Sequence, residues 1–447
     1  MSEDKKVLGV DSFIIVGTII HSTKLEKIDI LEDYLILIKK GKIITLTPSG
    51  NIKEIQKKYN IADSEVIQLG NGEFLMPGMI DTHIHAPQYP NIGLGSDKTL
   101  LEWLSKYTYP LEKQYSDVNF ATKVYSAVVK HTVACGTTTA CYFATIHLQS
   151  SMILADIVEK VGQRGLIGKI NMNINYPEGY GEETANSLRD TETFIKYIQQ
   201  KQNSTLLPVI TPRFAISCDM DLMTKLGVIA KTYDVHIQTH ISENCAEIEA
   251  VKQLFPDCKN YADVYNKANL LTSKTILAHG VHLEDAELKM LAATGAAISH
   301  CPNSNTNLRS GLCNVRRLLS AGIKVGLGTD VSGGYSPSII DAMHKALSVG
   351  IHLSFNDEKL SPLNYHEIFY LATLGGAQAL ALDEKIGNFM IGKDFDALVV
   401  NMNPSNTPNA PGGLPLNYKI EEYVQKFIYT GDDRNITRVF VAGKQIK

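Results

Sequence analysis

Cysteine is scarce in this sequence, and its spacing forms no pattern. Only seven cysteines occur among 447 residues, and no two of them stand in a C-x-x-C spacing. This argues against a disulfide framework or a structural zinc site built from cysteines, and it suits a reducing compartment. Neither sign of charge is in large excess, because 43 Lys and Arg oppose 47 Asp and Glu for a net charge of −4. We therefore expect no general attraction to nucleic acid or to an anionic membrane.

Long hydrophobic runs and nucleotide-binding motifs are also missing. The longest apolar run near the N-terminus, residues 13–20, contains a glycine and a threonine. It is too short to span a bilayer and makes a poor signal peptide, so we expect a cytoplasmic protein. No G-x-x-x-x-G-K-[ST] and no strand-borne G-x-G-x-x-G supports nucleotide-cofactor chemistry. The combination of H-x-E with P-C-x-x-C is absent, which excludes a zinc site of the cytidine-deaminase type.

The composition is that of a globular protein, with 44% hydrophobic and 20% charged residues. Strand patterns alternate with amphipathic helical stretches such as 120–133 and 284–293, and Asp117 stands where a helix N-cap is wanted. This alternation predicts an α/β fold, a (β/α)8 barrel, although an open doubly wound sheet would use the same order. The expected strands, rich in β-branched and apolar residues, are 74–83, 137–144, 166–174, 206–214, 235–242, 275–281, 296–300 and 324–329.

The two ends of the chain share a different pattern of short strands joined by tight turns. The expected strands are 34–39, 42–46, 395–400 and 438–441, and a Pro- and Gly-rich stretch at 408–415 predicts a long loop. We expect both ends to pair into one small β-sandwich domain, the alternative being two unrelated appendages. The predicted division is 1–72 for the N-terminal part of that domain, 73–384 for the barrel and 385–447 for its C-terminal part.

The strongest local signal is the stretch Asp81-Thr82-His83-Ile84-His85. Alternate residues of a strand point to the same face, so His83 and His85 project together at the end of the first barrel strand. The ends of later expected strands carry side chains of the same kinds: His240, Glu243, His279 and Asp330. Because the C-terminal ends of barrel strands meet at one mouth, and because imidazole and carboxylate groups bind zinc, the pattern predicts a mononuclear metal site there.

This order of residues resembles the amidohydrolase superfamily, and within it the sequence is most similar to the guanine deaminase family. The H-x-H and G-T-D motifs mark the superfamily, whereas Gln88, the P-R-F segment at 212–214 and the L-E-W-L segment at 101–104 are the more specific parts. The resemblance covers nearly the whole chain. Its further motifs lie at residues 77–89, 106–108, 136–140, 209–214, 239–244, 300–305, 326–331 and 431–435.

The resemblance implies zinc-dependent hydrolytic deamination of guanine to xanthine and ammonia, in a homodimer with one Zn²⁺ per chain. It implies that the metal ligands are His83, His85, His240 and Asp330. It casts Glu243 as a proton shuttle, His279 as a hydrogen-bonding group that steers the attack, and Asp330 as the acceptor of a proton from the attacking water. The expected substrate-binding residues are His85, Gln88, Trp103, Arg213, Phe214, His240, Glu243 and Asp330, with Arg213 donating to the guanine carbonyl.

Several alternatives stand beside these assignments. Glu243 could instead cap the helix that follows it, His279 and Trp103 could be buried core residues, and Arg213 could serve in an ordinary salt bridge. Three further histidines near strands are expected to be structural: His147, His236 and His300. At the level of function, the alternatives are another aromatic-base deaminase, a halide-displacing hydrolase on the same metal site, or a scaffolding protein that has lost its metal.

Overall fold

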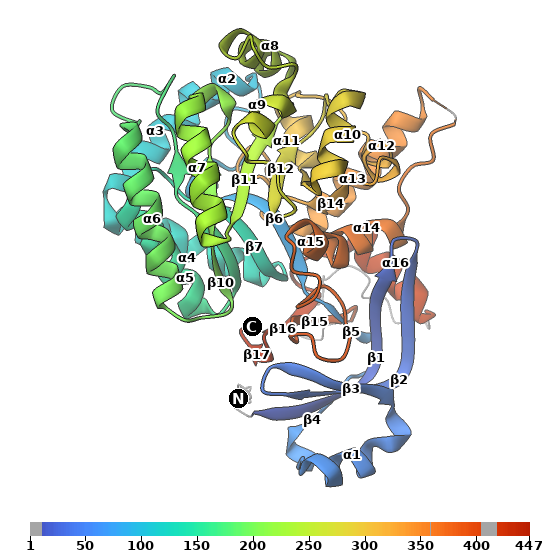
Figure 1. Cartoon of the computed structure of the whole chain (residues 1–447). Coiled ribbons are helices and arrows are strands. Elements are labelled where there is room, and N and C mark those ends of the chain that lie inside the picture. The colour runs from blue at the N-terminus through green and yellow to red at the C-terminus, as the bar shows by residue number, and fades with distance from the viewer. Residues whose placement is uncertain (1–10, 358, 404–417) are drawn as a thin grey trace.

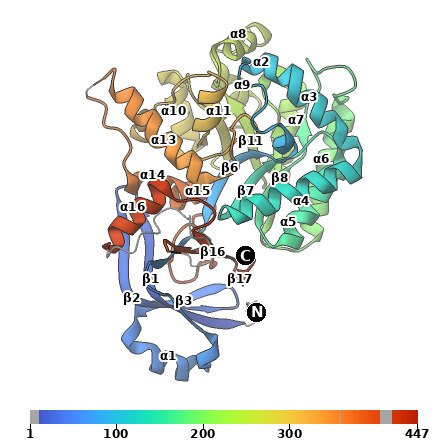
Figure 2. The same cartoon turned by 180° about the vertical axis from the view of Figure 1, so that it is seen from behind.

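The computed structural model describes residues 11–357, 359–403 and 418–447, which form a barrel with a smaller β-sheet beneath it (Figure 1). The stretch 408–415, where the sequence predicts a long loop, lies outside the described residues. The first and last described strands, β1 (Ser12–Lys24) and β17 (Lys444–Gln445), both belong to the smaller sheet, whereas α2 (Leu100–Trp103) lies at the far end of the molecule in Figures 1 and 2. The N- and C-terminal segments therefore meet in space, as the sequence predicts.

The barrel is a parallel sheet whose order follows the chain from β6 to β14. Its two outer strands meet, because Thr82 Oγ1 donates to the carbonyl oxygen of Leu327 at 2.9 Å and the Asp330 amide donates to the His83 carbonyl at 2.9 Å. The expected alternation is thus confirmed as a barrel and not as an open sheet. Its strands are β6 (Met79–His85), β7 (Thr137–Phe143), β8 (Arg164–Gly168), β10 (Leu206–Pro212), β11 (His236–Ile241), β12 (Thr275–His279), β13 (Ala297–His300) and β14 (Lys324–Leu327), with β9 (Ile170–Asn171) beside β10.

Helices surround the barrel and bury their apolar faces against its strands (Figure 2). Asp117 caps α4, since its side chain accepts from the Asn119 amide. The helices are α4 (Val118–Ala134), α5 (Leu148–Val161), α6 (Thr184–Gln200), α7 (Met220–Tyr233), α8 (Cys245–Leu254), α9 (Tyr261–Lys267), α10 (Asp285–Thr294), α11 (Pro302–Asn307), α12 (Val315–Ser320), α13 (Ile339–Ser354), α14 (Tyr365–Ala372), α15 (Leu374–Ala379) and α16 (Ile420–Thr430). This ring of helices leaves the C-terminal ends of the strands facing α2.

The smaller sheet joins both ends of the chain, because β5 pairs in parallel with β1 and antiparallel with β15. The prediction of a shared terminal sheet is therefore confirmed, and that of two unrelated appendages is wrong. Its strands are β1 (Ser12–Lys24), β2 (Lys27–Lys39), β3 (Lys42–Pro48), β4 (Val66–Gln68), β5 (Glu73–Pro77), β15 (Ala397–Asn401), β16 (Ile436–Val441) and β17 (Lys444–Gln445), with α1 (Ile52–Tyr59) after β3.

Two expected strands are each divided in the structure: residues 166–174 contain the end of β8 and the short β9, both paired with β10, and residues 74–83 divide between two sheets. Residues 74–83 were expected to form a single strand, but they divide into β5 of the terminal sheet and β6 of the barrel. The break lies at Gly78, whose amide donates to the Asp396 carbonyl at 2.9 Å. A bulkier residue would not fit there, since a Cβ on Gly78 would lie 2.0 Å from Thr138 Oγ1. Hydrophobic pattern alone does not reveal this change of sheet, because both strands are buried.

A buried ion cluster joins the barrel to the terminal sheet. Arg164, at the start of β8, is 1% exposed and donates to Asp396 through Nε (2.9 Å) and Nη2 (3.1 Å), and to Asp394 through Nη2 (2.9 Å). Asp396 also accepts from the Ala442 amide at 2.7 Å. The cluster therefore connects the start of β8 with residues just before β15 and with the residue just after β16.

We expect Arg164→Met to lower the free energy of unfolding by about 3–5 kcal/mol, because it leaves the buried Asp396 carboxylate without its cationic partner. The midpoint of urea denaturation measures this loss. Arg189→Met is the matched control: its ion pair with Asp190 is on the surface, and such pairs contribute about 0–1 kcal/mol. If both variants lose the same small amount, the cluster does not hold the two parts together.

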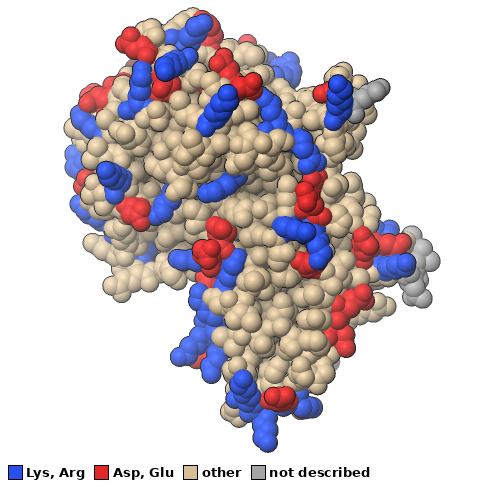
Figure 3. Space-filling view, turned by 45° about the vertical axis from the view of Figure 1, so that its right-hand side comes forward, with Lys and Arg blue, Asp and Glu red and all other residues tan. Residues whose placement is uncertain are grey.

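Charges of both signs are interspersed over the face of the molecule shown in Figure 3. Among the described residues, no helix combines the length and apolar character needed to cross a membrane.

Candidate active site

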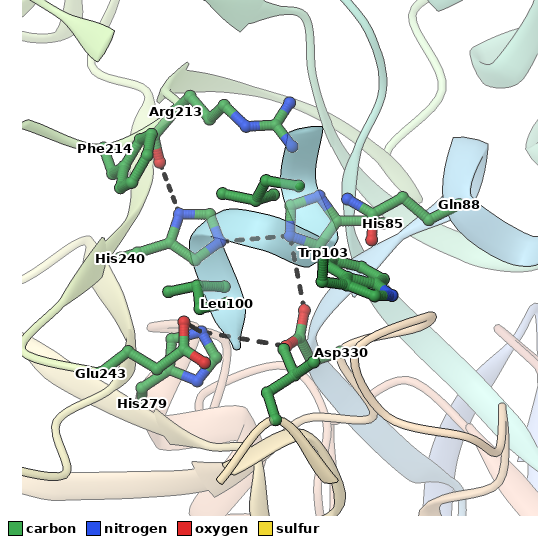
Figure 4. A pocket seen from close by; sticks show the side chains of 12 residues that line it. His85, Gln88, Leu100, Trp103, Arg213, Phe214, His240, Glu243, His279 and Asp330 are labelled. Atoms are coloured by element: carbon green, nitrogen blue, oxygen red, sulfur yellow. Dashed lines mark hydrogen bonds and ion pairs between the residues drawn. The ribbon is translucent and has the colours of Figure 1, made fainter. Parts of the chain in front are cut away.

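The expected metal-binding side chains meet at the C-terminal ends of the barrel strands. Figure 4 shows three of them, His85, His240 and Asp330. His83 and His85 come from β6, His240 from β11, and Asp330 follows β14. His85 Nε2 lies 3.1 Å from His240 Nε2 and 3.4 Å from Asp330 Oδ1, and His83 Nε2 lies 3.2 Å from the same Asp330 oxygen. The ligand atoms of His83, His85 and His240 lie within 4.8 Å of one another, and so do those of His83, His279 and Asp330, so the four expected ligands gather around one place with His279 beside them.

Hydrogen bonds on the far side of the rings determine which nitrogen carries the proton. His83 Nδ1 donates to Gln238 Oε1 at 2.7 Å, and His240 Nδ1 donates to the Arg213 carbonyl at 2.5 Å. In both rings this leaves a lone pair on Nε2, directed at the common point. Burial first, and then the neighbouring His83, lower the pKa of His85 and His240 well below the ordinary histidine value, so these rings are neutral.

This donor set fits a metal cation. His83 Nε2 and His85 Nδ1 are buried without a hydrogen-bond partner, and lone pairs that face one another at 3.1 Å repel unless a proton or a cation lies between them. Ligands about 2.0–2.1 Å from a tetrahedral zinc ion lie roughly 3.4 Å from each other. The separations of 3.1, 3.2 and 3.4 Å agree with that spacing. Neutral imidazoles and a carboxylate are also the ligand types that zinc prefers.

Glu243 and His279 lie beside this point. Glu243 Oε2 is 3.4 Å from His279 Nε2, and Glu243 Oε1 accepts from Ser310 Oγ at 2.8 Å. Burial, followed by the charge of Asp330, raises the pKa of Glu243 to about 8, although the hydrogen bond from Ser310 opposes the shift. Glu243 is therefore placed to hold a proton, while a cation nearby would favour its release.

The alternative role of Glu243 as a helix cap is wrong. Asn244 caps α8, since its side chain accepts from the Ala246 amide. Glu247, four residues after Glu243, completes the cap by accepting from the amides of Glu243 (2.9 Å) and Asn244 (3.2 Å). The Glu243 carboxyl group thus remains free of the helix and points into the pocket (Figure 4).

The backbone is strained where the strands deliver these groups. Ser242 (φ 48°) and His279 (φ 78°) adopt the left-handed region that L-residues other than Asn and Asp seldom occupy, and Asp330 (φ 46°) adopts it as well, at a smaller cost for an Asp. Each lies at or just past the end of a barrel strand. Such conformations cost about 1–3 kcal/mol each and cluster at functional sites.

A polar wall and an apolar wall complete the pocket. Arg213 and Gln88, both 2% exposed, form one side and share a carboxylate partner, Glu112. Trp103 and Phe214 line the other part of the pocket together with three leucines: Leu100, Leu104 and Leu308. Trp103 packs in the same buried cluster as Phe214, so it serves both the core and the pocket wall. A flat molecule with polar edges suits such walls.

The sequence alone does not identify Glu112 as part of the site. It does predict that three histidines, His147, His236 and His300, lie outside the site. Glu112 is followed directly by Lys113 and Gln114, as a surface glutamate would be, and the one signal for it is that a buried arginine needs a buried anion. His236 Nε2 lies 2.8 Å from the Leu380 carbonyl oxygen at the opposite end of β11. His147 and His300 do not line the pocket that the described residues form around Asp330.

Comparisons with known proteins agree with this site. A model of the amidohydrolase family matches residues 74–446. The guanine deaminase of Rattus norvegicus is 49% identical over 434 residues, 96% of this chain and 95% of the rat protein. That of Escherichia coli (strain K12) is 35% identical over 417 residues, 93% and 91% of the two chains.

Among solved structures, a guanine deaminase from C. acetobutylicum with guanine bound in its active site has a TM-score of 0.90 and 36% identity. The match covers 98% of this chain and 100% of that one. The family model spans most of the chain, and the relatives are well above 30% identical over almost their full length. The chain therefore belongs to the amidohydrolase family and, within it, to the family of guanine deaminases.

Proposed function

We propose that this protein hydrolyses guanine to xanthine and ammonia in a zinc-dependent reaction. The observation that carries the proposal is the convergence of the metal-binding atoms with a buried pocket whose polar wall is built from Arg213 and Gln88. The high identity to guanine deaminases supports it, as does the similarity to a structure with guanine bound. In the reaction, a bond forms between the water oxygen and C2 of guanine, and the bond from C2 to the exocyclic amine breaks.

His83, His85, His240 and Asp330 would hold one zinc ion per chain. When bound, zinc lowers the pKa of water from about 15.7 to about 7 and so supplies a nucleophile at neutral pH. Burial would raise the pKa of the Asp330 carboxyl group, but a bound cation would favour its ionised form. Asp330 is therefore ionised and able to accept a proton from the attacking water.

Glu243 and His279 carry the remaining proton transfers in this proposal. Attack at C2 increases the negative charge on the adjacent ring nitrogen, and the buried Glu243 carboxyl group protonates that atom. His279 Nδ1 donates to Asn305 Oδ1 at 2.8 Å, which directs its Nε2 toward Glu243 and Asp330. From there His279 can hydrogen-bond to the attacking oxygen and help to pass its proton to the departing amine.

Substrate recognition would come from the polar wall. Arg213 donates to the carbonyl oxygen at position 6 of guanine, and Gln88 contacts the ring edge. Phe214 and Trp103 pack on or beside the faces of the ring. His85, His240, Glu243 and Asp330 also line the pocket, so the bound base would contact them at its reacting end.

The test is ammonia release from guanine, adenine, cytosine and ammeline, with bound metal measured on the same sample. We expect rapid release from guanine, about one zinc per chain, and little release from adenine, because its amine at position 6 would face the Arg213 donors. Efficient turnover of adenine or ammeline with none of guanine would contradict the proposal and favour another aromatic-base deaminase.

We further propose that the protein is cytoplasmic and forms a homodimer. We also propose that each chain has domain boundaries at residues 72/73 and 384/385. All seven cysteines are free, which supports a reducing compartment. The dimer rests on the family resemblance. The second boundary follows the split between the barrel and the terminal sheet, but the first assigns β5 to the barrel although β5 pairs in the terminal sheet, so the split there lies after Pro77.

A further inference from the structure

Glu112 is the common partner of the two side chains that form the polar wall. It ends the short helix α3 (Tyr109–Glu112) and is 0% exposed. Its Oε2 accepts from Arg213 Nη1 at 2.5 Å and from the Tyr180 hydroxyl at 2.6 Å. Its Oε1 accepts from Arg213 Nη2 at 3.2 Å and from Gln88 Nε2 at 3.0 Å. Both oxygens are therefore fully used.

The Arg213 guanidinium is thus anchored on two sides. The bidentate bond to Glu112 holds its plane, and the Tyr109 ring lies 5.0 Å from Arg213 Cζ. Burial alone would lower the pKa of Arg213, but the Glu112 charge more than offsets this and raises it. Arg213 therefore stays charged although it is buried, and its remaining N–H groups are available to a ligand in the pocket that it lines.

Glu112 also determines the orientation of the Gln88 side-chain amide, that is, the directions in which its Nε2 and Oε1 atoms point. Since Nε2 donates to Glu112, Oε1 faces the other way and accepts from the Ser332 amide at 3.2 Å. The second N–H of Gln88 is left for a ligand, while its oxygen is already engaged. The wall consequently presents hydrogen-bond donors from both Arg213 and Gln88.

We propose that Glu112 is a specificity-determining positioning residue: it makes this wall a donor surface and so selects purines with an oxygen at position 6 over purines with an amine there. Guanine presents only acceptors on its O6 and N7 edge, whereas a 6-amino purine places a donor against the donors of the wall. The inference rests on the proposed function and adds the residue that sets its selectivity.

The substitution Glu112→Gln tests this with two probes that carry the same amine at C2, guanine and 2,6-diaminopurine. An amide in place of the carboxylate cannot accept all four donors, and in either orientation Arg213 loses a charged partner. We expect KM for guanine to rise at least about tenfold, with kcat changed less, because the lost contacts serve binding. The inhibition constant of 2,6-diaminopurine, divided by KM for guanine, should fall at least about tenfold.

Two further variants keep the test decisive. Glu182→Gln is the matched control, because Glu182 is a carboxylate with 9% of its side chain exposed that pairs with the buried Lys169 at 2.6 Å but does not line the pocket. It should leave the ratio of the two constants unchanged, even if it lowers the melting temperature. Glu112→Asp keeps the charge and should recover part of the selectivity, and it serves in place of the Gln variant if that one does not fold.

Equilibrium binding separates this inference from the proposed function. Dissociation constants for both purines, measured by calorimetry on zinc-loaded protein carrying Glu243→Gln with and without Glu112→Gln, need no turnover. Failure of the wild-type protein to deaminate guanine would overturn the proposed function alone. An equal loss of affinity for both purines, or an unchanged ratio, would overturn the role of Glu112 and leave it a structural ion pair.

Discussion

His240→Ala should remove both the metal and the activity. We expect the zinc content to fall from about one ion per chain to nearly none, and kcat/KM for guanine to fall by well over about a hundredfold, since even residues behind the ligands change metal affinity or activity by about 10- to 100-fold. His240 supplies one of the three ring nitrogens that lie within 4.8 Å of one another, and alanine has no atom that could replace it. Elemental analysis and ammonia release on the same preparation measure the two effects.

His236→Ala is the matched control for this loss. It removes a buried histidine from the same strand, β11, at the end remote from the pocket. Its zinc content should stay near one per chain, although stability should fall. Removal of zinc from the wild-type protein by a chelator should abolish activity, and added zinc should restore it. A fully active preparation without bound metal would contradict the metal site.

Glu243→Gln should stop the chemistry without disturbing the site. We expect kcat to fall at least about a hundredfold, because general acid–base groups typically contribute about 10² to 10⁴ in rate. The amide keeps the shape of the carboxyl group but has no proton that it can transfer. Zinc content should not change, since Glu243 is not among the atoms that converge on the metal position, and guanine should still bind.

Glu247→Gln is the control for the second prediction. Glu247 is also buried and lies four residues further on, but it contacts the start of α8 and the Tyr261 hydroxyl. Glutamine is tolerated at that position of a capping box, so we expect a stability loss of about 1 kcal/mol or less and a nearly normal kcat. A near-normal kcat in Glu243→Gln as well would leave Asp330 and His279 to move the protons.

The sequence by itself determined which chemical groups meet. The alternation of strands and helices predicts that all the strand ends lie at one mouth, and the parity of a strand places His83 and His85 on one side. These rules depend on local geometry, so they need no knowledge of distant contacts. The family resemblance added the roles of Glu243, His279, Gln88 and Arg213, which spacing alone does not supply.

Only the tertiary structure decided how those groups are oriented. Residues 74–83 became two strands because Gly78 meets Asp396, more than 300 residues away in the chain. The proton positions on His83 and His240 follow from Gln238 and the Arg213 carbonyl, and the donor wall follows from Glu112. Hydrogen bonds and buried charges depend on atoms brought together by folding, and a pattern of residue types along the chain does not contain those distances.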